Sequence, residues 1–193
     1  MRGLHFALCF AVGGAFLPLC ADAQMQQGGL PRLIRSGSGF GCEQTKEQLE
    51  RSQRNGSANA CGQVGPLALD MSRGEAEKVL GAPTTSKSFG TNTFYIYSLQ
   101  VDEVAHMVTY AVVGYDPRQH VNSIQLTGLP WPGAWAFNDI KLGDTGKAVI
   151  ARLGEPHGIS PGRGNGTLVW DYLPWTFSFE IKGTIVSSIR VSE

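Results

Sequence analysis

Histidines are the side chains of this chain with the widest catalytic range, because they titrate near neutral pH and can also bind metal ions. His106, His120 and His157 are scattered along the sequence. They stand in no H-E-x-x-H or G-x-S-x-G pattern, and no cysteine lies beside them. The sequence therefore predicts a protein that is not an enzyme, with no catalytic residue, no metal site and no cofactor.

Two other groups of residues could suggest chemistry, and each has a structural explanation. Asp139, Asp144 and Glu155 are close in sequence, but they lie around the start of an expected helix, where acidic side chains favour the helix dipole. The glycine-rich segment Gly162–Gly166 lacks the lysine and the strand-to-helix setting of a phosphate-binding loop. A hairpin loop is the better interpretation.

The main organising feature is a pattern that occurs twice, 73 residues apart. The first copy runs from Leu69 to Pro83 and the second from Leu142 to Pro156. In each copy a leucine is followed by a hydroxyl residue three positions later, then by a short helical stretch ending in Leu-Gly-x-Pro. A fixed internal spacing of this kind indicates a duplicated unit.

Both copies carry signals for the start and the end of a helix. Ser72 and Glu75 form an S-x-x-E capping box in the first copy, and Gly81 stands where a helix commonly ends. In the second copy Thr145 is the expected cap and Gly154 the expected end, but the glutamate of the box is missing. We therefore expect two short helices that depend on tertiary packing.

Strands are expected after each helix, and matching pieces follow in the same order. Phe94–Leu99 corresponds to Leu168–Tyr172, and Val121–Leu126 corresponds to Val186–Val191. Alternation of apolar and polar residues between Trp175 and Lys182 supports an antiparallel meander in the second copy. The predicted fold class is α+β, with two tandem units. Each unit is a short helix (or helix pair) packed on a three- to four-stranded antiparallel sheet.

The beginning of the chain has the features of a secretory signal. A basic residue precedes an apolar run, and Ala21-Asp22-Ala23 forms a small-x-small cleavage site. We therefore expect cleavage after Ala23 and a periplasmic or secreted mature chain, with lipidation at Cys20 as the disfavoured alternative. The expected division is a signal peptide (1–23), an N-terminal arm (24–63), a first unit (64–128), a Pro/Trp-rich connector (129–136) and a second unit (137–193).

Two cysteines, Cys42 and Cys61, remain in the mature chain. An even pair in an exported protein indicates a disulfide, which here would hold an expected helix over Glu43–Arg54. A metal site is a poor alternative, because no histidine lies near the pair.

Composition narrows the range of partners. Sixteen basic and sixteen acidic residues balance, so no basic face for nucleic acid is expected. Beyond the signal, no apolar run reaches the length of a transmembrane helix. Peripheral association with an outer membrane remains compatible with these features.

The double occurrence of L-x-x-S/T, a short helix and L-G-x-P, followed by Trp170-Asp171-Tyr172 and more weakly by Tyr95-Ile96-Tyr97, resembles the BamE (SmpA/OmlA) family. In tandem the pattern is also similar to β-lactamase inhibitory protein. The resemblance covers roughly residues 67–193. It implies an envelope protein that binds other proteins and uses no cofactor. In two respects the chain departs from the assembly lipoproteins, which have one unit and a lipidated cysteine.

Aromatic side chains are the candidates for a partner-binding surface, because Tyr and Trp offer contact area at small entropic cost. The strand Phe94–Leu99 is apolar on both faces, so it needs a second cover from the other unit or from a partner. The alternative is that these aromatics simply fill the core. The candidate partner-binding residues are Tyr95, Tyr97, Trp170, Tyr172 and Trp175.

The predicted function is a non-catalytic exported envelope protein that binds another protein, in outer-membrane assembly or envelope maintenance. The alternative is a soluble inhibitor of an extracytoplasmic hydrolase, with loop 86–92 or 160–166 entering the active site of the enzyme. A third possibility is a carrier of a small ligand in a groove near Trp131 and Trp135.

Overall fold

The structure is a computed structural model of the 193-residue chain. It describes residues 32–36, 39–44, 46, 50, 61–90, 92–104, 106–130, 135–174 and 176–193. The expected signal peptide with Cys20, Trp131 of the connector and Trp175 lie outside the described residues. Most of the expected helix over 43–54 also lies outside the described residues. Of those described, Glu43 ends a strand, whereas Lys46 and Glu50 are helical.

Strands dominate the described residues. The elements before the middle of the chain are β1 (Arg32–Ser36), β2 (Gly39–Glu43), β3 (Gln63–Val64), β4 (Leu67–Ala68), α2 (Arg73–Leu80), β5 (Thr85–Phe89), β6 (Asn92–Asp102), β7 (Met107–Tyr115) and β8 (Val121–Thr127). Those that follow are β9 (Ala136–Phe137), β10 (Ile140–Lys141), α3 (Gly146–Leu153), β11 (Gly158–Pro161), β12 (Thr167–Tyr172), β13 (Phe177–Lys182) and β14 (Ile185–Ser192).

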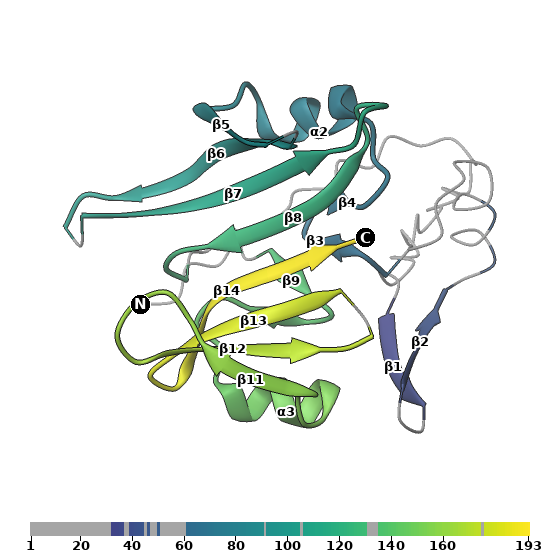
Figure 1. The fold of residues 1–193 in the computed structure, drawn as a ribbon, viewed down its shortest axis with the longest axis vertical. Helices are drawn as coiled ribbons and strands as arrows, with labels where there is room; N and C mark the ends of the chain where they lie inside the picture. The colour runs from purple at the N-terminus through teal and green to yellow at the C-terminus, as the bar shows by residue number, and fades with distance from the viewer. Residues whose placement is uncertain are drawn as a thin grey trace, which may run out of the picture.

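Eight strands form one antiparallel sheet in the order β11-β12-β13-β14-β8-β7-β6-β5 (Figure 1). Each half of this order is a meander, and the two meanders meet where β14 pairs with β8. Three small two-stranded sheets, β1-β2, β3-β4 and β9-β10, complete the described strands.

The predicted fold class, α+β with two separate helix-on-sheet units, is wrong. The chain is mostly β and is built on one continuous sheet. The physical reason lies at the last strand of each meander. Alone, each would be a sheet edge with a row of unpaired backbone N–H and C=O groups, and pairing β8 with β14 satisfies both rows.

The seam between β8 and β14 has local two-fold symmetry. Ile124 pairs with Val191, and Leu126 pairs with Ile189. When the two strand sequences are aligned, Ile124 corresponds to Ile189 and Leu126 corresponds to Val191. Each of the two pairs therefore joins the first of these positions in one strand to the second in the other. Gln125 and Arg190 correspond to each other and lie directly opposite at the centre. The halves thus meet as the copies of a symmetric dimer do.

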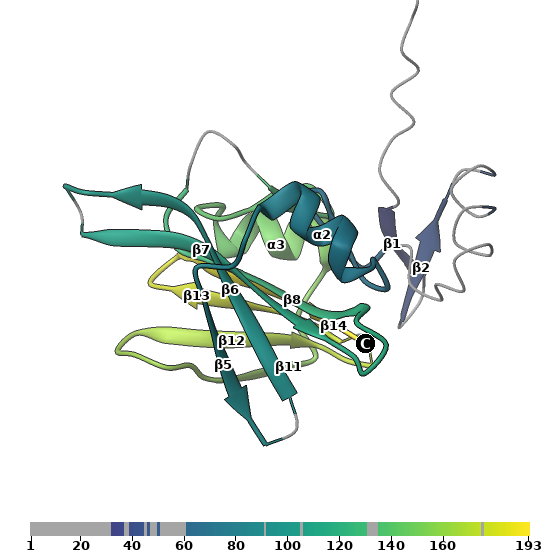
Figure 2. The same ribbon diagram turned by 90° about the horizontal axis from the view of Figure 1, so that it is seen from above.

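Both helices lie on the same side of the sheet (Figure 2). Ser72 and Glu75 make the predicted capping box at the start of α2, and the Thr145 hydroxyl accepts a hydrogen bond from the Ala148 N–H at the start of α3. Val149 and Leu153 of α3 are fully buried against the sheet, whereas Ala76 is the buried residue of α2. These local helix predictions are confirmed.

Arg73 joins α2 to the sheet in another way. Its guanidinium lies 4.3 Å from the centre of the Tyr95 ring, and its Nε donates to Glu77 Oε1 at 2.7 Å. Cation–π contact and an ion pair therefore supplement the small apolar stripe of this helix.

The hairpin β1-β2 packs on the helix side of the second half. Phe40 contacts the rings of Tyr172 and Phe177, and the Arg35 Nη1 donates to the Leu153 carbonyl at the end of α3 at 3.0 Å. A disulfide joins Cys42 at the end of this hairpin to Cys61, which confirms the predicted pairing. The N-terminal arm thus contributes to the core and caps a helix.

We expect the whole sheet to unfold as one unit, because the two halves share buried residues at the seam. Ile189→Ala should lower the free energy of unfolding by about 2–5 kcal/mol, since the side chain is completely buried. Urea unfolding followed by far-ultraviolet circular dichroism and tryptophan fluorescence should show one shared transition, shifted as a whole. Two separate transitions, with only one shifted, would contradict the single sheet.

Candidate functional site

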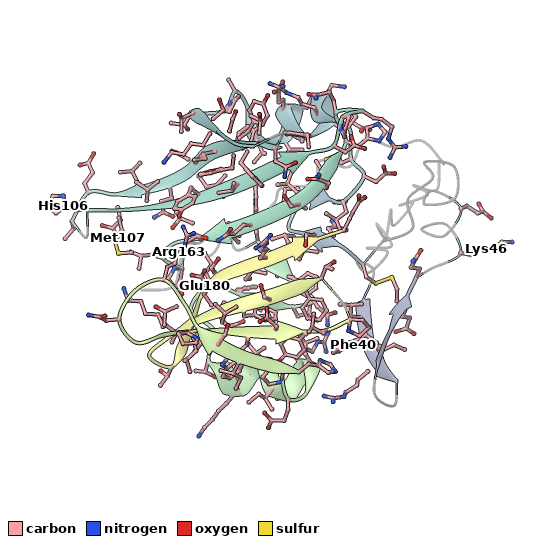
Figure 3. All side chains as sticks on the ribbon, in the orientation of Figure 1. Phe40, Lys46, His106, Met107, Arg163 and Glu180 are labelled. Carbon is pink, nitrogen blue, oxygen red and sulfur yellow. A yellow bond between two sulfur atoms is a disulfide. The ribbon has the colours of Figure 1, made fainter. Side chains whose placement is uncertain are left out.

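The histidines that could do chemistry do not come together. His106 lies at the tip of the β6–β7 hairpin (Figure 3), and His157 packs edge-on against the Tyr172 ring. His120 accepts or donates through Nδ1 at 3.1 Å from Asp70 Oδ1. Asp70 has a positive φ of 66°, and its second carboxylate oxygen is buried without a hydrogen bond. Here a histidine–carboxylate pair closes the turn before α2.

The acidic residues near α3 have structural contacts. Asp144 Oδ2 accepts a hydrogen bond from the Lys141 N–H at 2.8 Å, and Asp139 pairs with Arg152. Gly162–Gly166 forms the loop between β11 and β12, as the hairpin interpretation predicts.

Two of the five aromatic candidates are core residues. Tyr97 is 1% exposed and Tyr172 is 0% exposed. The hydroxyl of Tyr172 donates to the Gly154 carbonyl at 2.9 Å, and the hydroxyls of Tyr97 and Tyr115 are 3.1 Å apart. As the chain is folded, neither ring has surface to offer a partner.

The other candidates differ in position. Tyr95 is half-buried on the helix side, where its hydroxyl accepts from Arg73 Nη1 at 3.0 Å. Trp170 is half-buried beside Gly146 of α3, and its indole N–H is buried without a partner. The role of these two side chains in binding remains a prediction, as does that of Trp175, which is outside the described residues.

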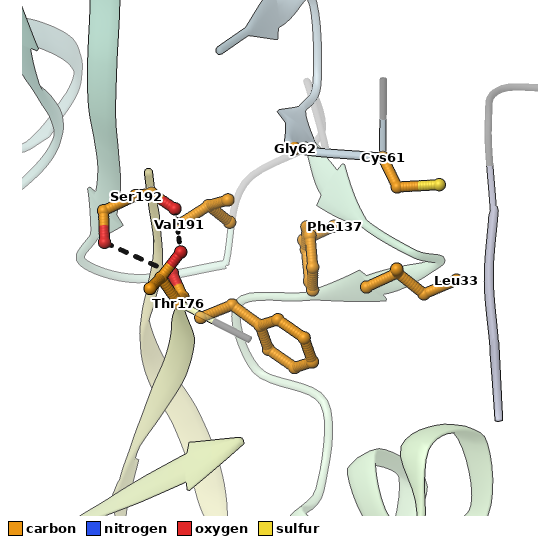
Figure 4. Close-up of a pocket in the computed structure, with 8 residues that line it drawn as sticks. Leu33, Cys61, Gly62, Phe137, Thr176, Val191 and Ser192 are labelled. Carbon is orange, nitrogen blue, oxygen red and sulfur yellow. Dashed lines mark hydrogen bonds between the residues drawn. The ribbon is translucent and has the colours of Figure 1, made fainter. Parts of the chain in front are cut away.

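A pocket opens beneath the N-terminal hairpin (Figure 4). Leu33, Phe137, Phe177 and Val191 are among its lining residues. Its interior of about 20 Å³ suits a single water molecule. It is thus far smaller than the pockets that hold organic ligands.

On one face of the eight-stranded sheet, no helix of the described residues is present (Figure 2). On this open face the first half presents apolar side chains. The strand register identifies them, because directly opposite residues point to the same side of a sheet. Val112 lies opposite Ile96, and Val108 lies opposite Val101. We call this set the apolar stripe; it consists of Phe89, Phe94, Ile96, Val101, Val108, Tyr110 and Val112.

The exposed part of the stripe is concentrated at its two ends. Phe89 is 65% exposed and contacts Phe94 with its ring tilted, with 6.2 Å between the ring centres. At the other end Val101 is 60% exposed and Val108 is 38% exposed. On β6 the stripe is interrupted by the exposed Ser98, which lies opposite Tyr110, whereas Val108, Tyr110 and Val112 follow one another on β7. Single exposed apolar residues are common, but a group of them on one face is typical of a contact surface.

Polar side chains occupy the centre of the same face. Gln125 donates to the hydroxyls of Thr127 and Ser188 at 3.2 and 3.1 Å, and these two hydroxyls are 2.9 Å apart. The network lies at the β8–β14 seam, next to Arg190. A satisfied network of this kind fixes the centre of the face.

The two halves differ at equivalent positions of the open face. Moving from the seam toward the edge of the first half, Gln125 of β8 is followed by Val112 of β7 and then by Ile96 of β6. Moving toward the edge of the second half, Arg190 of β14 is followed by Ser178 of β13 and then by Asp171 of β12. The second half therefore builds the same sheet with polar residues at these places. Consequently, the fold does not need apolar side chains at the positions of Ile96 and Val112, whereas Val169 keeps an apolar residue at the position equivalent to Phe94.

The β6–β7 hairpin extends past its neighbours as a two-stranded arm. Val104, at its turn, is 94% exposed, and its N–H donates to Asp102 Oδ1 at 3.0 Å. Figure 3 shows His106 and Met107 at the outer end of this arm. The hydrogen bond fixes the turn, so the exposed valine is held in a defined position.

Part of this surface could be found from the sequence. The doubly apolar strand Phe94–Leu99 indicates that two covers are needed, and Phe94 and Ile96 indeed face away from the helices. Val112 and Tyr110 gave no such signal, because their side of β7 depends on a register that only the pairing reveals.

No protein-family model and no curated protein matches this chain. One similar solved structure is a DUF4309 family protein (YjgB) from Bacillus subtilis, with a TM-score of 0.42 and 14% identity over 63% of this chain and 77% of that chain. Another is an extracellular protein containing an SCP domain from Bacillus anthracis, with a TM-score of 0.41 and 13% identity over 64% of this chain and 44% of that chain.

Buried tyrosines should make the protein sensitive to alkali. Burial raises the pKa of Tyr172 from 10.0 to about 12, and burial also raises the pKa values of Tyr97 and Tyr115. The unfolded chain loses these protons at lower pH than the folded chain does, so stability is full below pH 10 and falls as the pH rises toward 12. Tyr172→Phe should reduce this fall, although it removes one hydrogen bond. Thermal unfolding between neutral pH and pH 12 measures both effects, and equal slopes for the variant and the wild type would contradict the assignment.

Proposed function

We propose that this chain is an exported, non-catalytic protein that binds another protein through the open face of its sheet. The observation that carries the proposal is the contrast between Ile96–Val112 and Asp171–Ser178 at equivalent positions of one sheet. Apolar residues at two positions where the fold also accepts polar ones, on a face that no described helix covers, favour a protein partner.

The disulfide supports an oxidising compartment. A bond between Cys42 and Cys61 persists outside the cytosol, in the periplasm or after secretion. The described residues contain no helix long and apolar enough to cross a membrane. Cleavage after Ala23, a soluble mature form and work within envelope assembly or maintenance belong to the same proposal.

Inhibition of an extracytoplasmic hydrolase is the second candidate. The specific observation in its favour is the hairpin formed by β5 and β6, whose Phe89 is 65% exposed beside the turn at Gly90. Such a side chain could enter the cleft of an enzyme. The identity of the captured partner separates the two functions, because a hydrolase would lose activity in the complex and an assembly component would have none to lose.

The internal repeat supplies a matched experiment for the open face. The double variant I96D/V112S gives the first half the residues of the second, and D171N/S178A alters the equivalent pair as a control. Because the second half folds with these residue types, we expect both variants to keep thermal stability close to that of the wild type.

Partner capture should separate the variants. Tagged full-length chains, cross-linked in the cells that produce them, should recover the same partner with the wild type and the control. Recovery with I96D/V112S should fall at least tenfold, as expected when central contacts of an interface are lost. Equal recovery by all three stable proteins would refute the role of the stripe.

A further inference from the structure

We infer that the occupant of the apolar stripe is an amphipathic α-helix of the partner, about four turns long. This inference rests on the proposed function and adds the kind of element that is bound and its orientation.

Backbone pairing excludes an added strand over the stripe's central part. β6 pairs with β5 on one side and β7 on the other, and β7 pairs with β6 and β8. The N–H and C=O groups around Ile96 and Val112 are therefore already used within the sheet. Whatever lies on this face has to satisfy its own backbone groups, and a helix does so internally.

The dimensions of the stripe fit one helix. From Phe94 to Val101 the strand rises about 23 Å at roughly 3.3 Å per residue. A helix of about 15 residues has the same length at roughly 1.5 Å per residue, and its diameter of about 10 Å covers two to three strands. Apolar residues of such a helix at i, i+3, i+4 and i+7 would contact the stripe.

Charges of opposite sign mark the two ends of the stripe. Lys87 lies opposite Phe94 on the same face and is exposed. At the far end Glu103 is exposed at the tip of the arm, next to Asp102. A helix with an acidic end at Lys87 and a basic end at Glu103 is complementary to this arrangement.

The direction of the helix follows from the size of these charges. Side chains carry a full charge, whereas each end of the helix dipole is equivalent to about half a charge. Stable helices carry acidic residues in the first turn and basic residues in the last. The bound helix therefore places its N-terminus near Lys87 and its C-terminus near Glu103.

Selection from a phage-displayed library of random peptides of about 16 residues, on the immobilised full-length chain, tests the inference. We expect enriched peptides with apolar residues at helical spacing, an acidic N-terminal end and a basic C-terminal end. Their affinity should fall at least tenfold for I96D/V112S, and also for the milder V112T combined with F94S, and should be unchanged for D171N/S178A.

The charge-reversed variant K87E/E103K tests the orientation. Selected peptides should bind it about tenfold more weakly, and peptides with exchanged end charges should recover the loss. Enriched peptides that alternate apolar and polar residues, no enrichment, or affinities unaffected by the stripe variants would overturn the inference. The cross-linking of whole partners is independent of peptide shape, so it tests the proposed function separately.

Discussion

The pairing of β8 with β14 is the interaction on which the rest of the structure depends. It joins two meanders that would otherwise each end in an unsatisfied edge, and it buries Ile124, Leu126 and Ile189 at the middle of one core. Short helices of eight residues would be marginal alone. Here α3 is held by the burial of Val149 and Leu153, whereas α2 buries Ala76 and is also held by the contact of Arg73 with the Tyr95 ring.

Duplication explains why the seam forms and also why the two faces of the sheet can differ. A two-fold arrangement lets equivalent strands pair with each other, so a single strand sequence satisfies both sides of the contact. Once joined, the helix side is constrained by packing in both halves. On the open face the Gln125, Thr127 and Ser188 side chains bond to one another at the seam. Outward from the seam the two halves carry different residue types at equivalent positions, Ile96 against Asp171 and Val112 against Ser178.

The sequence predicts local elements well, and its failure concerns how they combine. Ser72 and Thr145 cap the helices as expected, Cys42 bonds to Cys61, and the meander that follows Gly158 is present. The helix caps and the meander depend on residues that are close together in the sequence. The disulfide follows from the even number of cysteines in the expected mature chain. The two meanders join into one sheet through long-range pairing between β8 and β14. The alternation of apolar and polar residues in a strand does not indicate which other strand it pairs with. The same limit applies to the aromatic candidates. Tyrosine is a residue type that is common in binding surfaces, but Tyr97 and Tyr172 lie on the buried face of their strands.

The difference between the edges of the sheet and its open face bears on the binding mode proposed for that face. A partner that adds a strand needs free backbone groups, which a sheet offers at its edges. One edge of this sheet is β11, where Pro161 removes a donor, and the other is β5, where the exposed Lys87 opposes pairing with a second copy of itself. Both outermost strands thus carry residues that discourage strand addition, and the edges of the β6–β7 arm beyond Ile96 and Tyr110 are the parts of the sheet to which this does not apply. The centre of the apolar stripe lies on the face between the outermost strands. Recognition by side chains on that face, of an element whose backbone is already satisfied, is the mode of binding that this distribution favours.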